Sequence, residues 1–107
     1  MEKKDYLPLG SVVYLENGTK KLIIISRALV MRNGAGFLFF DYGGVPYPEG
    51  LMDDKIAYFQ HESINKIVFE GYKDLDEEAT VEKINLFIER HPDIPRGSVE
   101  AALAQNM

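Results

Sequence analysis

The sequence predicts an α+β fold: a small, highly curved antiparallel sheet or a partly open five-stranded barrel, followed by a C-terminal helix and a short terminal helix. Five short β-branched and aromatic runs, separated by turn residues, precede residue 72. Helical periodicity begins after it. Nine of the 12 aromatic residues lie between Phe37 and Tyr72, where we expect them to fill the barrel and the helix–sheet interface. The 107 residues suit a single domain (1–107), with a β-rich body over about residues 7–72 and a helical part over about residues 74–104.

The first two strands are predicted on either side of a turn. Residues 11–15 are mainly β-branched and aromatic, as strand residues commonly are. Asn17 and Gly18 follow, and both tolerate the positive φ that a tight hairpin turn requires. Residues 22–31 are apolar on both faces apart from two polar residues, a pattern typical of a central strand that is covered on both sides.

Three further strands are predicted. Residues 33–36 form a second turn, and residues 37–42 are expected to form the third strand of an antiparallel meander. Residues 56–59 and 66–69 predict the fourth and fifth strands. A single helical turn over residues 61–64 is expected to connect them.

The helical part begins with a capping pair, because Asp74 precedes Glu77 by three residues. Apolar residues then recur at helical spacing and form one stripe: Val81, Ile84, Phe87 and Ile88. Pro92 and Pro95 end this helix. A last short helix is predicted over residues 98–104, with a serine at its start as the cap.

Composition narrows the classes of function. The net charge is −5, whereas a general nucleic-acid binder needs clustered Lys and Arg. The chain has no cysteine, which excludes disulfides and thiolate metal sites. Its longest apolar run, residues 22–25, is far shorter than the roughly 20 residues that span a bilayer, and its first residues lack the apolar centre of a secretory signal. We therefore expect a cytoplasmic protein with neither nucleic acid nor membrane as a partner.

Charge is distributed unevenly along the chain. Residues 1–33 carry six basic and three acidic groups, whereas residues 70–90 carry seven acidic and three basic groups. Two interpretations of the acidic part stay open. It is either a solvated helix face, or a surface that attracts a basic partner and speeds the encounter.

Two histidines are the first candidates for catalysis. His61 precedes Glu62 and Ser63, and all three side chains are capable of acid–base or nucleophilic chemistry. Adjacent residues in one turn point in different directions, so this run alone does not predict a triad. The favoured interpretation is that His61 or Ser63 caps the turn. His91 precedes a proline at the expected helix end, where a C-terminal cap is favoured over a catalyst.

We predict no metal or cofactor site. Four side chains offer oxygen and nitrogen ligands: Asp53, Asp54, His61 and Glu62. Their spacing matches no calcium loop and no zinc motif. Asp41 and Glu49 are acids of the kind that glycosidases use, but any two acids in the chain fit that description equally well. The glycines at 34–36 and 43–44 lack the lysine and the following helix that hold a phosphate.

Residues 41–54 (DYGGVPYPEGLMDD) are expected to form a loop. Pro46 and Pro48 restrict the residues before them to extended geometry, so this segment presents Tyr47 with little loss of entropy on binding. One interpretation is that Tyr47 is an interface anchor; the other is that it closes an open end of the barrel. The predicted protein-binding residues are Val45, Pro46, Tyr47, Pro48, Glu49 and Leu51.

Five motifs occur in order along residues 7–72. They read LPLGSVV at 7–13, GTKKL at 18–22, DYGGVPYPEG at 41–50, FQHESI at 59–64 and VFEGY at 68–72. In this order they resemble a small bacterial family known as domain of unknown function 4176, and the PYPEG and VFEGY blocks are its specific parts. The resemblance leads us to expect a bulkier residue at one position of Gly43–Gly44, so the glycine pair predicts a looser loop.

The resemblance also implies a function. Members of this family look like companions of type VII secretion systems in Gram-positive bacteria, encoded near toxins with an LXG-type targeting domain. It therefore implies a non-enzymatic cytoplasmic chaperone or adaptor that holds a toxin before export, and it brings no catalytic residues. An immunity protein that inhibits a neighbouring toxin is the alternative, and an enzyme that uses His61 and nearby acids is the third hypothesis. A free sheet edge would also allow two copies to form a homodimer.

Overall fold

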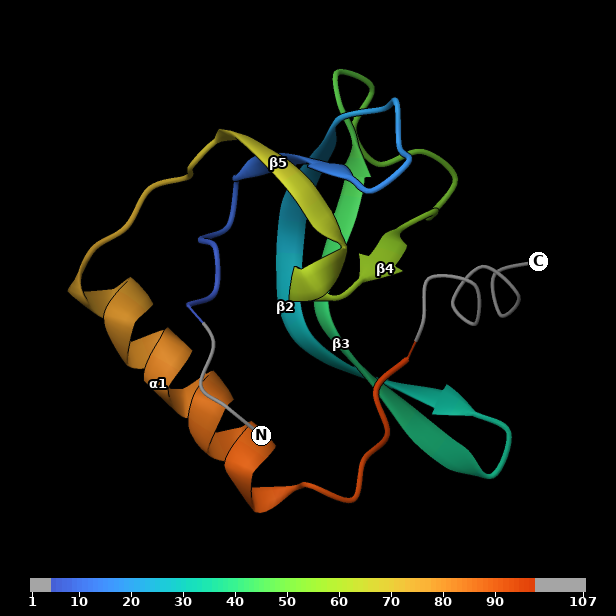
Figure 1. Ribbon diagram of the computed structural model, residues 1–107, viewed down its shortest axis with the longest axis vertical. Coiled ribbons are helices and arrows are strands. Elements are labelled where there is room, and N and C mark those ends of the chain that lie inside the picture. Colours follow the sequence, from blue (N-terminus) through green and yellow to red (C-terminus); the bar gives the residue numbers. More distant parts are fainter. Residues whose placement is uncertain (1–4, 98–107) are drawn as a thin grey trace.

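The computed structural model describes residues 5–97, and it confirms the predicted α+β fold (Figure 1). The described strands are β1 (Val12–Leu15), β2 (Leu22–Asn33), β3 (Gly36–Pro46), β4 (Ala57–Phe59) and β5 (Ile64–Phe69). A short 3₁₀ turn, η1 (His61–Ser63), connects β4 to β5, close to the predicted helical turn. The helix α1 (Leu75–Arg90) follows β5. The short terminal helix predicted over residues 98–104 lies outside the described residues.

The five strands form one open, curved sheet in the order β4-β3-β2-β1-β5 (Figure 1). Each neighbouring pair is antiparallel. β4 and β5 are the two ends of this order, and they do not pair with each other within residues 5–97. The sheet therefore curls toward a barrel but stays open, which leaves an edge strand at each end.

β3 is longer than the sequence predicted. It ends at Pro46, so the loop expected over residues 41–54 is wrong in its first part. Gly43 and Gly44 lie within the pairing of β3 with β2 and β4 rather than in a loose loop. A Cβ on Gly43 would lie 2.5 Å from the hydroxyl oxygen of Ser26. A larger residue there would force the Ser26 side chain to shift, which favours glycine at this position.

Two details of the first strands also differ from the prediction. The connection from β1 to β2 spans residues 16–21 and is longer than a tight hairpin turn, although Asn17 has the expected positive φ of 62°. β2 pairs with β1 and β3, as predicted for a central strand. Its second face is not covered, however, because Ile25 and Val30 each remain 40% exposed. β2 is therefore only partly covered, whereas residues 39–45 of β3 are buried on both faces of the strand.

One hydrophobic core joins the sheet, the N-terminal segment and α1. Its buried members are Tyr6, Leu7, Val13, Leu22, Ile24, Phe39, Tyr42, Phe59, Ile84 and Ile88. The N-terminal segment runs between the sheet and α1 (Figure 1). The aromatic residues fill this core only in part, contrary to the prediction, because Phe37, Tyr47, Phe69 and Tyr72 are exposed.

The start of α1 is fixed by a cap and by a salt bridge. Asp74 is the N-cap, and its carboxylate accepts a hydrogen bond from the Glu77 amide at 3.1 Å, as predicted. The Glu77 side chain reaches β2 instead of completing a capping box. Its two oxygens pair with the two terminal nitrogens of Arg27 at 2.5 and 2.8 Å. This salt bridge attaches the first turn of α1 to the sheet.

The rest of α1 packs through the predicted stripe. Ile84 and Ile88 are buried in the core. His91 ends the helix, and its Nδ1 lies 2.9 Å from the Phe87 carbonyl oxygen, which confirms the predicted C-terminal cap. Among the described residues, no helix has the length and apolar character needed to cross a membrane.

Candidate functional site

The loop that follows β3 is the surface that the sequence singles out for binding. Directly after β3, the Tyr47 amide donates to the Lys21 carbonyl oxygen at 2.9 Å. The Gly50 amide donates to the Pro46 carbonyl oxygen at 2.6 Å. The first bond ties the loop to the start of β2, and the second closes a tight turn. The backbone of the loop is therefore anchored at Tyr47 and at Gly50.

Most of the predicted binding residues are accessible in this loop. The four exposed ones are Tyr47, Pro48, Glu49 and Leu51. Tyr47 is 43% exposed, so it does not close the end of the barrel from within. Pro46 is half-buried, and Val45 is only 4% exposed. The Val45 side chain therefore belongs to the interior, where a partner does not reach it.

Charged side chains surround Tyr47. The Lys20 ammonium lies 2.7 Å from both carboxylate oxygens of Glu49, and this hydrogen bond holds the pKa of Glu49 below its usual range. The Lys21 ammonium lies 5.1 Å from the centroid of the Tyr47 ring, within cation–π distance. The loop thus combines apolar and charged groups, a mixture that is common where proteins bind one another.

A buried polar cluster around Asp41 is the second feature. Asp41 lies in β3 and is fully buried. Its carboxylate accepts hydrogen bonds from the Tyr6 hydroxyl at 2.5 Å, from the His61 amide at 2.8 Å and from the Arg96 guanidinium. The Gln60 side-chain oxygen accepts from the Asp41 amide at 3.0 Å. These contacts tie the N-terminal segment, η1 and the chain after α1 to one point of the sheet.

His61 contributes its ring to the same cluster. Its Nδ1 lies 2.8 Å from the Tyr42 hydroxyl oxygen, and that hydroxyl also accepts from the Leu7 amide at 3.0 Å. The predicted turn cap was His61 or Ser63. The N-cap of η1 is Gln60, which makes no side-chain cap hydrogen bond, and the His61 ring bonds Tyr42 instead. The ring thus joins η1 to β3 at Tyr42, and the same tyrosine hydroxyl holds the N-terminal segment at Leu7.

Two tyrosines of the cluster are held in their neutral form. Burial raises the pKa of Tyr6 well above its ordinary value, and the hydrogen bond to Asp41 adds to this effect. Burial likewise raises the pKa of Tyr42, against a smaller lowering by the Leu7 amide. Both hydroxyls therefore stay protonated in the folded protein at neutral pH.

We expect alkaline pH to destabilise the protein through these two tyrosines. A raised pKa stabilises the fold below the ordinary tyrosine value of about 10, and this stabilisation is lost as the pH rises toward the folded-state pKa. Ultraviolet absorbance should show Tyr6 and Tyr42 ionising together with the loss of circular dichroism. Tyr6→Phe and Tyr42→Phe should each remove part of the absorbance change that accompanies the loss of circular dichroism. Ionisation of all six tyrosines while the circular dichroism is still unchanged would contradict this prediction.

The remaining candidate acids lie elsewhere. Asp41 is buried in the cluster, whereas Glu49 is exposed beside Lys20, so these two carboxylates do not face a common cleft. Asp53 and Asp54 have positive φ values of 52° and 56° in an exposed turn. Within residues 5–97, no group of three or more His, Asp or Glu side chains is arranged to hold a metal ion.

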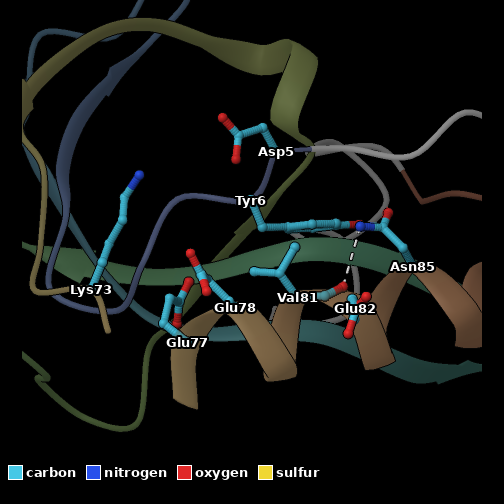
Figure 2. A pocket seen from close by; sticks show the side chains of 8 residues that line it. All are labelled: Asp5, Tyr6, Lys73, Glu77, Glu78, Val81, Glu82 and Asn85. Atoms are coloured by element: carbon cyan, nitrogen blue, oxygen red, sulfur yellow. Dashed lines mark hydrogen bonds between the residues drawn. The ribbon is translucent and has the colours of Figure 1, made fainter. Parts of the chain in front are cut away.

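A groove between the N-terminal segment and α1 was not predicted. It has a volume of about 260 Å³ and is lined by Asp5, Tyr6, Lys73, Glu77, Glu78, Val81, Glu82 and Asn85. Figure 2 shows Asp5 on one side of the groove, with Glu78 and Glu82 on α1 on the other. The acidic composition of residues 70–90 was visible in the sequence. The position of Asp5 opposite these acidic residues could not be predicted, because the N-terminal segment and α1 meet only in the folded chain.

Comparison with known protein families gives a match over most of the chain. The sequence matches the family described as domain of unknown function (DUF4176) over residues 6–80. The matched region includes all five strands, the loop after β3 and the first turns of α1. No curated protein and no solved structure matches the chain.

Proposed function

Because the chain belongs to the family described as domain of unknown function (DUF4176), we propose that it is a non-enzymatic protein-binding module. Its role is that of a cytoplasmic chaperone or adaptor for an LXG-type toxin of a type VII secretion system. The toxin and the secretion system come from the family resemblance alone. The observation that carries the binding role is the exposed, backbone-anchored loop around Tyr47.

The loop has the properties of a binding anchor. Hydrogen bonds already fix its backbone at Tyr47 and Gly50. Binding a partner therefore costs less conformational entropy than ordering a free loop would. The loop presents an aromatic ring beside two exposed aliphatic side chains, Leu51 and Met52. Aromatic residues of this kind often contribute most of the binding energy at an interface. The module would act by mass action, covering an apolar or strand-edge surface of the client until export.

We expect the combined substitution Tyr47→Ala and Leu51→Asp to reduce client binding about tenfold or more. The first change removes the anchor ring, and the second places a charge on an apolar part of the same loop. The fold should be unchanged, since both side chains are exposed. Affinity purification from the source cell, followed by quantitative mass spectrometry, measures the recovered toxin. Leu86→Ala is the control, because Leu86 on α1 is 42% exposed, close to the 43% of Tyr47. Recovery of no secreted toxin or secretion component by the unmodified protein would count against the proposal.

An immunity protein is the second candidate, and the acidic groove of Figure 2 favours it, because an inhibitor that fills a basic active site needs acidic groups. Co-expression separates the two roles. An immunity protein restores growth to cells that make the toxin domain alone. A targeting chaperone has no need to do so, but it should increase export of the full-length toxin.

A further inference from the structure

Exposed apolar side chains follow one another along the chain from β5 to the first turn of α1. We define this β5–α1 surface by five side chains and their exposed fractions: Ile67 50%, Val68 46%, Phe69 61%, Tyr72 80% and Leu75 79%. β5 is an end strand of the sheet, and residues 65–70 are all exposed. Neither face of this part of the strand is therefore covered by the described chain. Large exposed apolar side chains that gather on one stretch of chain, with polar residues around them, are typical of sites of protein interaction.

The backbone of the β5–α1 surface is held in place at its centre. Gly71 lies against the N-terminal segment, where its amide donates to the Ser11 hydroxyl at 3.0 Å and a Cβ would collide with the Leu9 carbonyl oxygen. The Tyr72 hydroxyl donates to the Asp74 carboxylate at 3.4 Å, and Asp74 caps α1. The two exposed aromatic rings on either side of Gly71 are thus presented on a fixed chain, which lowers the entropy lost when a partner binds.

The margin of this surface is acidic. Residues 66–78 contain five acidic and two basic residues, and Asp76 and Glu78 are exposed beside Leu75. Glu70 and Lys73 already form an ion pair with each other. The acidic groove of Figure 2 shares Glu78 with this margin, and its Glu82 extends the negative charge further along α1. A partner with apolar and basic side chains would complement both the centre and the margin.

A second copy of the chain fits this surface poorly. Two copies would bring the same acidic margins together, and like charges across an interface oppose association. Lys66 also lies on the edge strand, and the pairing of β5 with β1 shifts register at Val68. A lysine and an irregularity on an edge strand are features that discourage pairing between sheet edges. The surface is therefore better suited to binding a different protein than to binding a second copy of this chain.

We propose that the β5–α1 surface binds a positively charged amphipathic segment of the client protein. The inference rests on the proposed function, because it specifies which kind of client segment the module recognises and where. The surface shares no residue with the loop around Tyr47, so the two proposals together give the client two contacts. Linking two contacts within one client raises the overall affinity above that of either contact.

Site-specific photo-cross-linking in the source cell tests this proposal. A photoreactive phenylalanine analogue replaces Phe69 or Tyr72 in the full chain, and Tyr47 or Leu51 in parallel; all four side chains are exposed, so the fold should be retained. Mass spectrometry then identifies the cross-linked peptide. We expect positions 69 and 72 to give peptides of one client that carry net positive charge and spaced apolar residues.

The outcomes separate this inference from the proposed function. Cross-links from positions 47 and 51 alone would overturn the inference and leave the chaperone role standing. Cross-links from positions 69 and 72 to an acidic segment, or to a second copy of this chain, would also overturn it. Absence of any cross-linked client at all four positions would count against both.

A binding measurement gives a second test. The identified segment is made as a labelled peptide, and its dissociation constant is measured with the full chain by fluorescence anisotropy. Phe69→Ser should weaken binding about tenfold or more, and added salt should weaken it further. Phe37→Ser is the matched control, because Phe37 in β3 is also an exposed phenylalanine, at 49%, and belongs to neither proposed binding surface. Equal losses for both variants would show that the peptide does not bind specifically at the β5–α1 surface.

Discussion

Asp41→Ala is expected to lower the free energy of unfolding by about 3–5 kcal/mol, a large part of the stability of an ordinary small domain. The carboxylate is fully buried and accepts hydrogen bonds from Tyr6, His61 and Arg96. Its removal leaves a buried hydroxyl and a partly buried guanidinium without this acceptor, and such groups are costly to bury unpaired. Urea unfolding followed by circular dichroism measures the change.

Three companion variants make this prediction specific. Asp41→Asn keeps the shape and loses the charge, so it should destabilise the protein less than alanine does. Tyr6→Phe removes a single hydrogen bond to the carboxylate and should cost about 2 kcal/mol. Glu49→Ala removes an exposed carboxylate and should leave the urea midpoint unchanged. A loss for Asp41→Ala no greater than that for Tyr6→Phe would show that the cluster is not a main source of stability.

Arg27→Ala is expected to destabilise the protein by about 3 kcal/mol and to loosen α1 from the sheet. The Arg27 and Glu77 side chains are only 6% and 12% exposed, so removing one partner leaves the other charged group almost buried. The salt bridge is also the connection nearest to the start of α1, whereas the buried residues Ile84 and Ile88 lie in its second half. Hydrogen exchange should therefore show the largest loss of protection in the first turns of α1.

A double substitution distinguishes the salt bridge from simple packing. Arg27→Met combined with Glu77→Leu removes both charges and keeps much of the volume, so it should be more stable than either single variant. Arg27→Lys keeps the charge but not the paired geometry and should fall between the wild type and Arg27→Ala. If the double variant is as unstable as the sum of the single losses, the two residues do not act as a pair.

The local elements could be predicted because each depends on neighbouring residues. The strands follow from runs of β-branched and aromatic residues, and the start of α1 follows from Asp74 three residues before Glu77. Ile84 and Ile88 reveal the buried stripe by their spacing. The C-terminal cap at His91 follows in the same way from the expected helix end.

The errors arose where packing overrides local preference. A glycine pair between two turn-rich stretches favours a loop, yet β3 continues through Gly43 and Gly44, which pair with β2 and β4. The close approach of Ser26 to Gly43 makes glycine suitable at that position of the strand. Val45 then falls inside the core, although its sequence context resembles that of the exposed Tyr47. The two sides of a strand differ only by what packs against them, and that is not visible in a single sequence.

The order of residues along the chain was sufficient to predict the class of fold, the position of the helix and its caps, and the stiff loop around Tyr47. Which polar groups meet depends on the folded chain. Tyr6, His61 and Arg96 reach Asp41 from 35, 20 and 55 residues away, and Arg27 reaches Glu77 from 50 residues away. The exposure of the aromatic residues at 69 and 72 likewise depends on it. Turns, caps and periodicity act over a few residues, whereas burial and charge pairing depend on how the curved sheet brings distant segments together.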